Sequence, residues 1–366
     1  MKKILIELCA VATLASCTKS EVLSFDQEAI GFENAFVDNS TRSVVDPSFA
    51  NTEEKMFDDF QVYGYVAGAP VFGADGVKVT KTVTDGNVNW TYSGVQYWIA
   101  GAIYNFSAVA PVTNGGWTKT NADKDATTLS FTNDGDTDLL YAQNPVYTAV
   151  TEGTNGTVGF TFRHVLSKVK FSFVNKYAAT NSSIRVKDIK ILDAYQKGSV
   201  VLNANSSTWT PTTGTNNLTL NFGNAALTVA DNSATKDEND KGYAFTANNT
   251  VESYNELFMI PGAGATSYTV DSTQMNGYTV QFTVELLVDG KEIKQYTHTI
   301  YTSFVPEPGK AYDLKAEITP ESIDPEHQQE EIKFTVTTIT DWDNDHDGKE
   351  STDGTDSEDN QVDTTI

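Results

Sequence analysis

The chain contains few of the residues that usually support catalysis or metal binding. Only two of its 366 residues are cysteines, Cys9 and Cys17, and both lie in the first seventeen positions. Disulfide frameworks and cysteine-based zinc sites are therefore excluded from the rest of the chain. The four histidines are scattered, and phosphate-binding, dinucleotide-binding and common hydrolase motifs are absent. The sequence predicts a protein that is not an enzyme and has no cofactor.

Positive charge is also scarce. The chain has 25 Lys and Arg against 49 Asp and Glu, which gives a formal net charge of −24. A field of this sign repels phosphate backbones, so nucleic acid is excluded as a partner. The content of 39% hydrophobic and 11% aromatic residues is sufficient to bury a core in each of two domains of ordinary size.

The only long hydrophobic run is at the N-terminus. Lys2 and Lys3 precede an apolar stretch over residues 4–14, which has the layout of a secretory signal and is too short to span a bilayer. Residues 14–17, Leu-Ala-Ser-Cys, match the lipobox of bacterial lipoproteins. We expect residues 1–16 to be a signal peptide and Cys17 to carry the acyl chains, such as palmitate, that anchor the protein in the outer membrane. The alternative is a plain signal peptide whose cleavage site contains a cysteine.

The rest of the chain predicts strands. Apolar and polar residues alternate with a period of two, turn residues separate the runs, and helical periodicity is nearly absent apart from residues 51–59. Asp289 and Gly290 separate two such runs and predict a two-residue type I′ hairpin. Strand spacing of about ten residues predicts an all-β fold of two antiparallel β-sandwich domains in tandem. The expected runs are residues 60–66, 104–110, 158–162, 169–174, 184–192, 218–222, 257–260, 278–288, 293–301, 311–318 and 332–339.

Composition divides the chain into five parts. After the signal peptide we expect an N-terminal segment over residues 17–42, an N-terminal sandwich over 43–180, a C-terminal sandwich over 181–342 and an acidic tail over 343–366. A polar break over residues 177–183 suggests the join between the sandwiches, and residues 319–331 form a Pro- and Glu-rich loop.

Four stretches resemble a known family. Residues 160–171 contain Phe-Arg-His-Val-Leu-Ser-Lys-Val and resemble a conserved segment of fimbrillin lipoproteins, the subunits of type V pili in Bacteroidales. Residues 97–111, 257–261 and 335–342 are similar to three further segments of that family. The resemblance implies two transthyretin-like β-sandwiches, a fimbrial role in adhesion and a final location in the cell-surface fimbrium.

The same resemblance implies a route of assembly. In the family, a trypsin-like protease cuts after an arginine and removes the first strand, and a strand of the next subunit fills the groove. Arg42 and Ser43 match the cleavage position, and residues 29–37 are the candidate removable strand. Val362, Thr364 and Ile366 alternate at the C-terminus and are the candidate donor. The implied partners are other fimbrial subunits, the arginine-specific protease and ligands on host or bacterial surfaces.

Other interpretations remain open. A tail that only extends into solvent would favour a tip or accessory subunit. The tryptophans Trp90, Trp98, Trp117 and Trp209 suggest a monomeric lipoprotein that binds glycans, although such positions are more often core. Asp343, Asp345 and Asp347 fit the start of a Ca²⁺ loop, but Gly354 replaces the final ligand. His164 is expected to be a structural residue at a sandwich edge.

Overall fold

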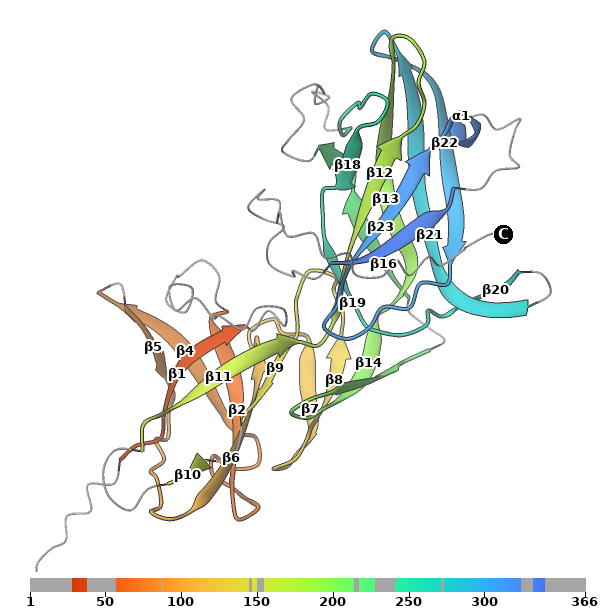
Figure 1. The fold of residues 1–366 in the computed structure, drawn as a ribbon. Helices are drawn as coiled ribbons and strands as arrows, with labels where there is room; N and C mark the ends of the chain where they lie inside the picture. The colour runs from red at the N-terminus through yellow and green to blue at the C-terminus, as the bar shows by residue number, and fades with distance from the viewer. Residues whose placement is uncertain are drawn as a thin grey trace, which may run out of the picture.

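The computed structural model describes residues 28–37, 57–85, 87–144, 147–149, 155–213, 217–227, 241–270, 273–323 and 332–339. Strands account for nearly all regular structure in these ranges (Figure 1). The elements of the first half are β1 (Gly31–Val37), β2 (Asp59–Val66), β3 (Ala69–Pro70), β4 (Val77–Thr84), β5 (Asn87–Thr91), β6 (Ile103–Ala110), β7 (Trp117–Ala122), β8 (Thr127–Thr132), β9 (Leu140–Gln143), β10 (Tyr147–Thr148) and β11 (Thr157–His164). Those of the second half are β12 (Ser167–Asn175), β13 (Ser182–Tyr195), β14 (Lys197–Leu202), β15 (Ser207–Pro211), β16 (Asn217–Gly223), β17 (Ala225–Leu227), β18 (Thr250–Ser253), β19 (Leu257–Met259), β20 (Thr266–Val270), β21 (Thr273–Val288), β22 (Lys291–Thr302), β23 (Ala311–Ile318), α1 (Pro320–Ile323) and β24 (Phe334–Ile339).

The first unit is a sheet that closes on itself. Its order is β10-β6-β9-β11-β1-β5-β4-β2-β3, and an additional pairing of β6 with β2 joins its two sides. The closed ring therefore runs β2-β6-β9-β11-β1-β5-β4 and back to β2. Its interior holds an apolar cluster that includes Phe60, Phe106 and Phe160. Within this ring, β1 is the link between β11 and β5.

The second unit is a sandwich of two sheets. One sheet has the order β17-β18-β12-β23-β24, with β19 paired to β12, and the other has the order β16-β13-β21-β20, with β22 paired to β21. The two sheets enclose the largest apolar cluster, in which Phe171, Phe173 and Phe282 are all fully buried. Together the units form the two β-sandwiches in tandem that the sequence predicts.

A four-stranded sheet connects the two units. Its order is β15-β14-β8-β7, so one hairpin comes from each half of the chain (Figure 1). Strands β8 and β14 are antiparallel and pair from Thr127↔Leu202 to Thr132↔Lys197. A third apolar cluster, with Leu129, Phe131 and Val200 fully or almost fully buried, lies beneath this sheet, and we call it the junction cluster. The junction is therefore a continuous sheet with its own core.

Most predicted strands are confirmed. β23 has the limits expected for residues 311–318, and every other predicted run corresponds to a strand within a few residues. The hairpin between β21 and β22 turns at Asp289 and Gly290, with φ of 51° and 74°. These left-handed values at both central positions define a type I′ turn.

Several features differ from expectation or were not predicted. β1 with β11 and β12 with β23 are parallel pairs in a fold expected to be antiparallel. The predicted loop over residues 319–331 contains α1, because Thr319 caps the amide of Ser322 and Pro320 suits the first helical position. The proposed helical turn over residues 51–59 is wrong at its end, where Asp59 begins β2, and residues 51–56 lie outside the described residues.

Packing changes from the first core to the second near residue 166. Phe162 belongs to the first cluster, whereas Val169, Phe171 and Phe173 of β12 already belong to the second. The predicted domain limits of 43–180 and 181–342 stay a prediction.

Candidate functional site

The N-terminal strand β1 completes the sheet of the first unit. It pairs in parallel with β11, in the register Gly31↔Thr157, Phe32↔Val158 and Glu33↔Gly159, and again at Phe36↔Thr161 and Val37↔Phe162. On its other side it makes one pair, Phe32↔Trp90, with β5. β1 is thus attached mainly through one long neighbour.

β11 depends on β1 for most of its own pairing. Its other neighbour, β9, pairs only with Arg163 and His164 at the end of the strand. For residues 157–162 of β11, β1 is therefore the only sheet partner among the described residues. Removing β1 would leave the backbone N–H and C=O groups of β11 that face it without partners, and such an edge readily accepts another strand.

The side chain of Phe32 fills the centre of the site. It is 5% exposed. Its ring centroid lies 5.2 Å from that of Tyr92, 6.0 Å from those of Phe72 and Phe160, and 6.3 Å from that of Phe60. Glu33, the next residue, is exposed. This alternation explains why the segment forms a strand with one face in the core.

The residues just before β1 are held by the β5–β6 connection. Ile30 is 1% exposed, and its amide donates to the carbonyl oxygen of Gln96 at 2.8 Å. The hydroxyl of Tyr92 donates to the carbonyl oxygen of Ile30 at 2.7 Å. Burial raises the pKa of Tyr92, so this hydroxyl stays protonated at neutral pH. The amide of Trp98 donates to the carbonyl oxygen of Glu28 at 3.0 Å.

Excision of this segment would open an apolar cleft. The cleft would be lined by Phe60, Phe72, Tyr92 and Phe160, the rings that surround Phe32. Burial of Phe32 and Ile30 contributes on the order of 5 kcal/mol in total. The arrangement therefore suits replacement of one strand by another with large apolar residues at alternate positions.

The structure places only part of the predicted site. Residues 29–37, the candidate removable strand, contain β1. The other predicted site residues lie outside the described residues: Cys17, Arg42, Ser43, Asp343, Asp345, Asp347, Val362, Thr364 and Ile366.

The four tryptophans considered for glycan binding belong to the cores. Trp98 is 5% exposed, Trp90 packs against the first cluster, and Trp117 and Trp209 pack against the junction cluster. The indole N–H of Trp209 donates to the carbonyl oxygen of Val165 at 2.7 Å. These positions explain the aromatics through packing and not through a sugar-stacking platform.

His164 has a structural setting at the end of β11. Its Nδ1 contacts Oδ2 of Asp138, and its side chain is 10% exposed. The described residues contain no group of three or more His, Cys, Asp or Glu side chains able to hold a metal ion.

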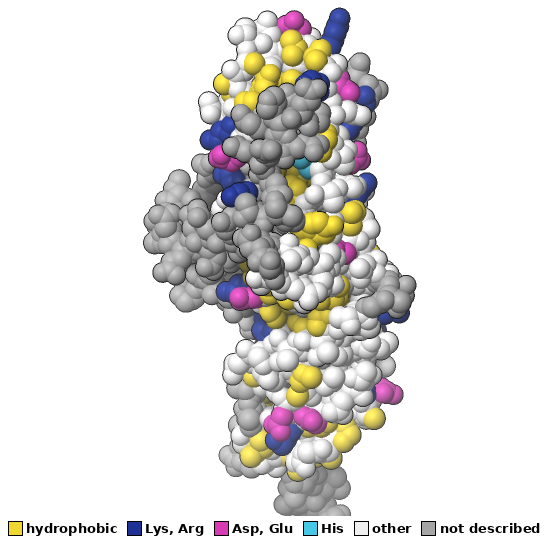
Figure 2. All heavy atoms as spheres, turned by 90° about the vertical axis from the view of Figure 1, so that its right-hand side faces the viewer, with side chains coloured by type: hydrophobic (Ala, Val, Ile, Leu, Met, Phe, Trp, Pro, Cys, Tyr) yellow, Lys and Arg dark blue, Asp and Glu magenta, His cyan; other side chains and the backbone are white. Residues whose placement is uncertain are grey.

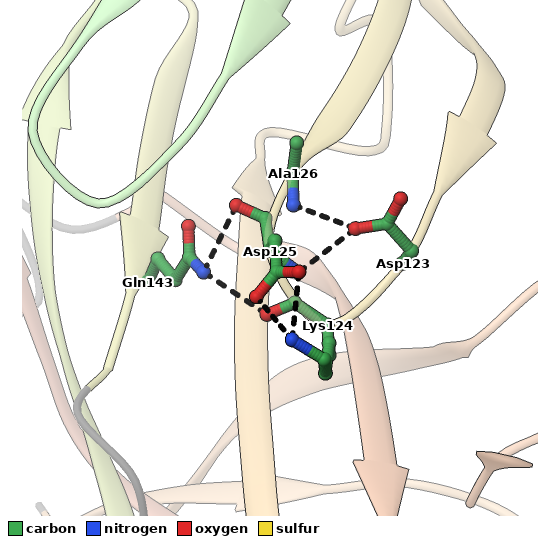
Figure 3. Close-up of polar contacts among 5 residues, drawn as sticks. All are labelled: Asp123, Lys124, Asp125, Ala126 and Gln143. Carbon is green, nitrogen blue, oxygen red and sulfur yellow. Dashed lines mark hydrogen bonds and ion pairs between the residues drawn. The ribbon is translucent and has the colours of Figure 1, made fainter. Parts of the chain in front are cut away.

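Acidic residues in the β7–β8 turn also have structural partners (Figure 3). Oδ1 of Asp123 accepts from the amides of Asp125 and Ala126 at 2.8 and 2.9 Å, and Asp125 pairs with Lys124. Gln143 of β9 donates to the carbonyl oxygens of Lys124 and Asp125. Hydrogen bonds within the turn fix its shape, and those from Gln143 hold it against β9 of the first unit.

The surface and the helices of the described residues bear on contact with a membrane. On the face in Figure 2, hydrophobic side chains form several separate groups with charged side chains between them. In the part of the chain that the structure describes, no helix has the length and hydropathy needed to cross a membrane.

Sequence reasoning missed two residues of the cleft. Phe72 lies in the loop after β3, and Tyr92 follows β5, so neither belongs to an alternating run. No pattern in the sequence connects them with Phe32, since the contacts form only when the ring closes.

The fold and this site define an all-β protein of two sandwiches whose N-terminal strand completes the first. The fimbrillin-like family model matches residues 41–342, most of the chain, and the protein belongs to this family. Its members are fimbrial and adhesion proteins of the cell surface, structural in type and not enzymatic. A search of curated protein sequences found no match.

Solved structures that match this chain come from several bacteria. A candidate cell adhesion protein from Bacteroides uniformis is 15% identical over 86% of this chain and 98% of its own, with a TM-score of 0.42. One from Parabacteroides distasonis is 11% identical over 85% and 97%, with a TM-score of 0.44. The fimbrial anchor protein Mfa2 from Porphyromonas gingivalis is 12% identical over 85% and 97%, with a TM-score of 0.32.

Proposed function

We propose that this protein is a structural subunit of an adhesive cell-surface fimbria that assembles by strand exchange. It is secreted as a lipoprotein acylated at Cys17 and held in the outer membrane, then cut between Arg42 and Ser43. The segment that contains β1 leaves, and a strand of a neighbouring subunit takes its place. The observation that carries this proposal is that β1 is both the main partner of β11 and the source of Phe32 in the core.

The distribution of arginines supports Arg42 as the cleavage site. The chain has three arginines, Arg42, Arg163 and Arg185. Arg163 donates to Oγ of Ser207 at 2.6 Å and to two backbone carbonyl oxygens. Arg185 is 8% exposed and pairs with Glu285 at 3.1 Å. Both lie within strands that are paired with neighbouring strands. A protease could therefore bind either segment in its cleft only after local unfolding. An arginine-specific protease would therefore cut the folded protein at Arg42.

The donor strand would be the end of the tail, with Val362, Thr364 and Ile366 as its alternating residues. Head-to-tail donation does not close on itself, so it produces a filament. The partners are then other fimbrial subunits, the processing protease and the surface ligands bound by the finished fimbria. A subunit that accepts a strand but donates none would instead end a filament as a tip or accessory adhesin.

The lipid-free precursor, residues 18–366, tests the proposal. We expect an arginine-specific protease under native conditions to make one cut, after Arg42. Once the N-terminal fragment has been released in mild denaturant, return to buffer should give multimers on size-exclusion chromatography. A variant with Arg42→Lys should stay intact and monomeric in the same protocol. Cleaved, fragment-free protein that refolds and stays monomeric would contradict the polymerising role.

A further inference from the structure

Exposed apolar residues are concentrated in the β5–β6 connection and at the first residue of β6. Val95, Tyr97, Ile99 and Ile103 are 47%, 49%, 57% and 55% exposed and are half of the large hydrophobic residues exposed in the described chain. We call these four residues the β5–β6 patch. No charged residue occurs between Asp85 and Lys119, although the whole chain has a net charge of −24.

The patch is held in place by the core beneath it. Trp98 and Tyr104 alternate with the exposed residues, are almost fully buried, and stack edge to face with centroids 4.8 Å apart. The amide of Ile99 donates to the hydroxyl oxygen of Tyr104 at 2.8 Å. The amides of Gly101 and Ala149 each donate across to the other segment at 2.9 Å. The apolar side chains are thus presented outward on a fixed backbone.

The patch also lies where the chain enters the first unit. Ala29 bridges to Tyr97, and the carbonyl oxygen of Glu28 accepts from the amide of Trp98. Strand β10, which pairs with the start of β6 at Ile103, lies at the end of the first unit farthest from α1 (Figure 1). Glu28 follows Cys17 by eleven residues. An extended chain of this length reaches at most about 40 Å.

We propose that the β5–β6 patch docks on the surface of a phospholipid bilayer while the precursor is tethered through Cys17. This inference rests on the lipidation in the proposed function. The tether brings this end of the molecule to the membrane, where Tyr97 suits the headgroup level and the aliphatic residues suit the layer beneath it.

The chemistry of the patch favours this occupant over others. Without lysine or arginine, the patch does not attract anionic headgroups, and the acidic body repels them, so the preferred surface is zwitterionic. Four partly exposed side chains supply far less than the roughly 800 Å² that each partner of a stable protein interface buries. A contact this small is weak by itself, and a tether that keeps its partner near raises the fraction of molecules that are docked.

A single fluorescent label tests this docking. Both cysteines precede residue 18, so the chain over residues 18–366 has none and an introduced cysteine is its only reactive thiol. We would label Ile99→Cys with an environment-sensitive dye and tether the chain by an N-terminal His tag to phosphocholine vesicles containing a nickel-chelating lipid. Ile293→Cys is the matched control, because Ile293 is also 57% exposed but lies in the second unit.

We expect the dye at position 99 to gain intensity and to emit at shorter wavelength on the vesicles, whereas the dye at position 293 does not change. No change at position 99, or equal changes at both positions, would overturn the proposal. A change at position 99 that appears without vesicles and grows with protein concentration would also overturn it and would indicate contact between copies.

A second measurement avoids both the label and the tether. Partition of the untagged chain into phosphocholine vesicles should fall about tenfold or more when Ile99→Ser and Ile103→Ser are combined, because burial of each isoleucine favours the membrane. Val201, in β14 of the four-stranded sheet that connects the units, is 42% exposed, and Val201→Ser should leave partition unchanged. Equal partition of all three proteins would contradict the docking. Mass spectrometry of the Cys17 peptide tests lipidation separately, so the two proposals can fail independently.

Discussion

The strand-exchange account makes its sharpest prediction at Phe32. This side chain is 5% exposed and contacts four aromatic rings, so Phe32→Ala removes the large apolar side chain that the described part of β1 places in the core. Substitutions of this kind in a core cost about 3–5 kcal/mol. In the intact precursor we expect the loss to appear as a lower unfolding midpoint of the first unit, while the separate core of the second unit keeps its stability.

We expect Phe32→Ala to affect retention of the cleaved N-terminal fragment more strongly than it affects the stability of the intact precursor. After the cut at Arg42, only noncovalent contacts hold the N-terminal fragment. A loss of about 3 kcal/mol from those contacts corresponds to roughly 100-fold weaker retention. We would measure release of the fragment over time by size-exclusion chromatography and mass spectrometry, and the rate of uptake of a synthetic strand peptide by the emptied protein.

Two controls make this test specific. Glu33→Ala changes an exposed side chain on the same strand and should leave release unchanged. Phe222→Ala empties a fully buried position in the second unit, so it should destabilise that unit without accelerating release. If nicked Phe32→Ala protein retained its fragment as long as the parent and the Glu33→Ala variant do, the cleft described here would not be what holds β1.

Three further predictions concern the framework around the site. Asp59 is buried, which by itself raises its pKa, but Lys78 and the amides of Val112 and Thr113 outweigh burial and lower the pKa to about 2. Ionised Asp59 stabilises the folded protein above the unfolded pKa, and this stabilisation is lost as pH falls through 2. Between pH 7 and pH 2 the unfolding free energy of Asp59→Asn should therefore change by about 2 kcal/mol less than that of the parent protein. Arg163→Ala removes three hydrogen bonds to residues 203–207 and should speed amide exchange in β14 and β15 but not in β20; unchanged exchange would refute this role. Gly290→Val places a β-branched residue at a φ of 74° with open space around it, so any loss of stability comes from backbone strain alone. We expect the unfolding free energy, measured by chemical denaturation, to fall by about 1–2 kcal/mol.

Local signals in the sequence predicted local structure well. Asp289 and Gly290 gave the hairpin because left-handed backbone geometry restricts which residues can occupy a type I′ turn. Alternation predicted the limits of β23 because a period of two reports which face of a strand is buried, whereas the strand over residues 29–37 was predicted only from the family resemblance.

Pairing between distant strands could not be predicted in the same way. Nothing in the pattern of β1 specifies that it runs parallel to β11, and nothing in β8 specifies β14 as its neighbour. Tyr63 and Tyr65 alternate with Phe60 and Val62 along β2, and they are buried as well, because the junction cluster covers their face. Alternation of apolar and polar residues no longer indicates the buried face of a strand when both of its faces are packed.

The central claim is that β1 occupies an edge of β11 that another subunit can fill. Hydrogen exchange of the β11 amides, read by mass spectrometry in three states, tests it most directly. The account predicts protection of those amides in residues 157–162 that face β1 in the precursor, loss of that protection in the cleaved monomer without its fragment, and renewed protection in multimers. Strand β12, whose parallel partner β23 stays in place, should remain protected throughout. Equal protection of β11 before and after removal of the fragment would contradict the account.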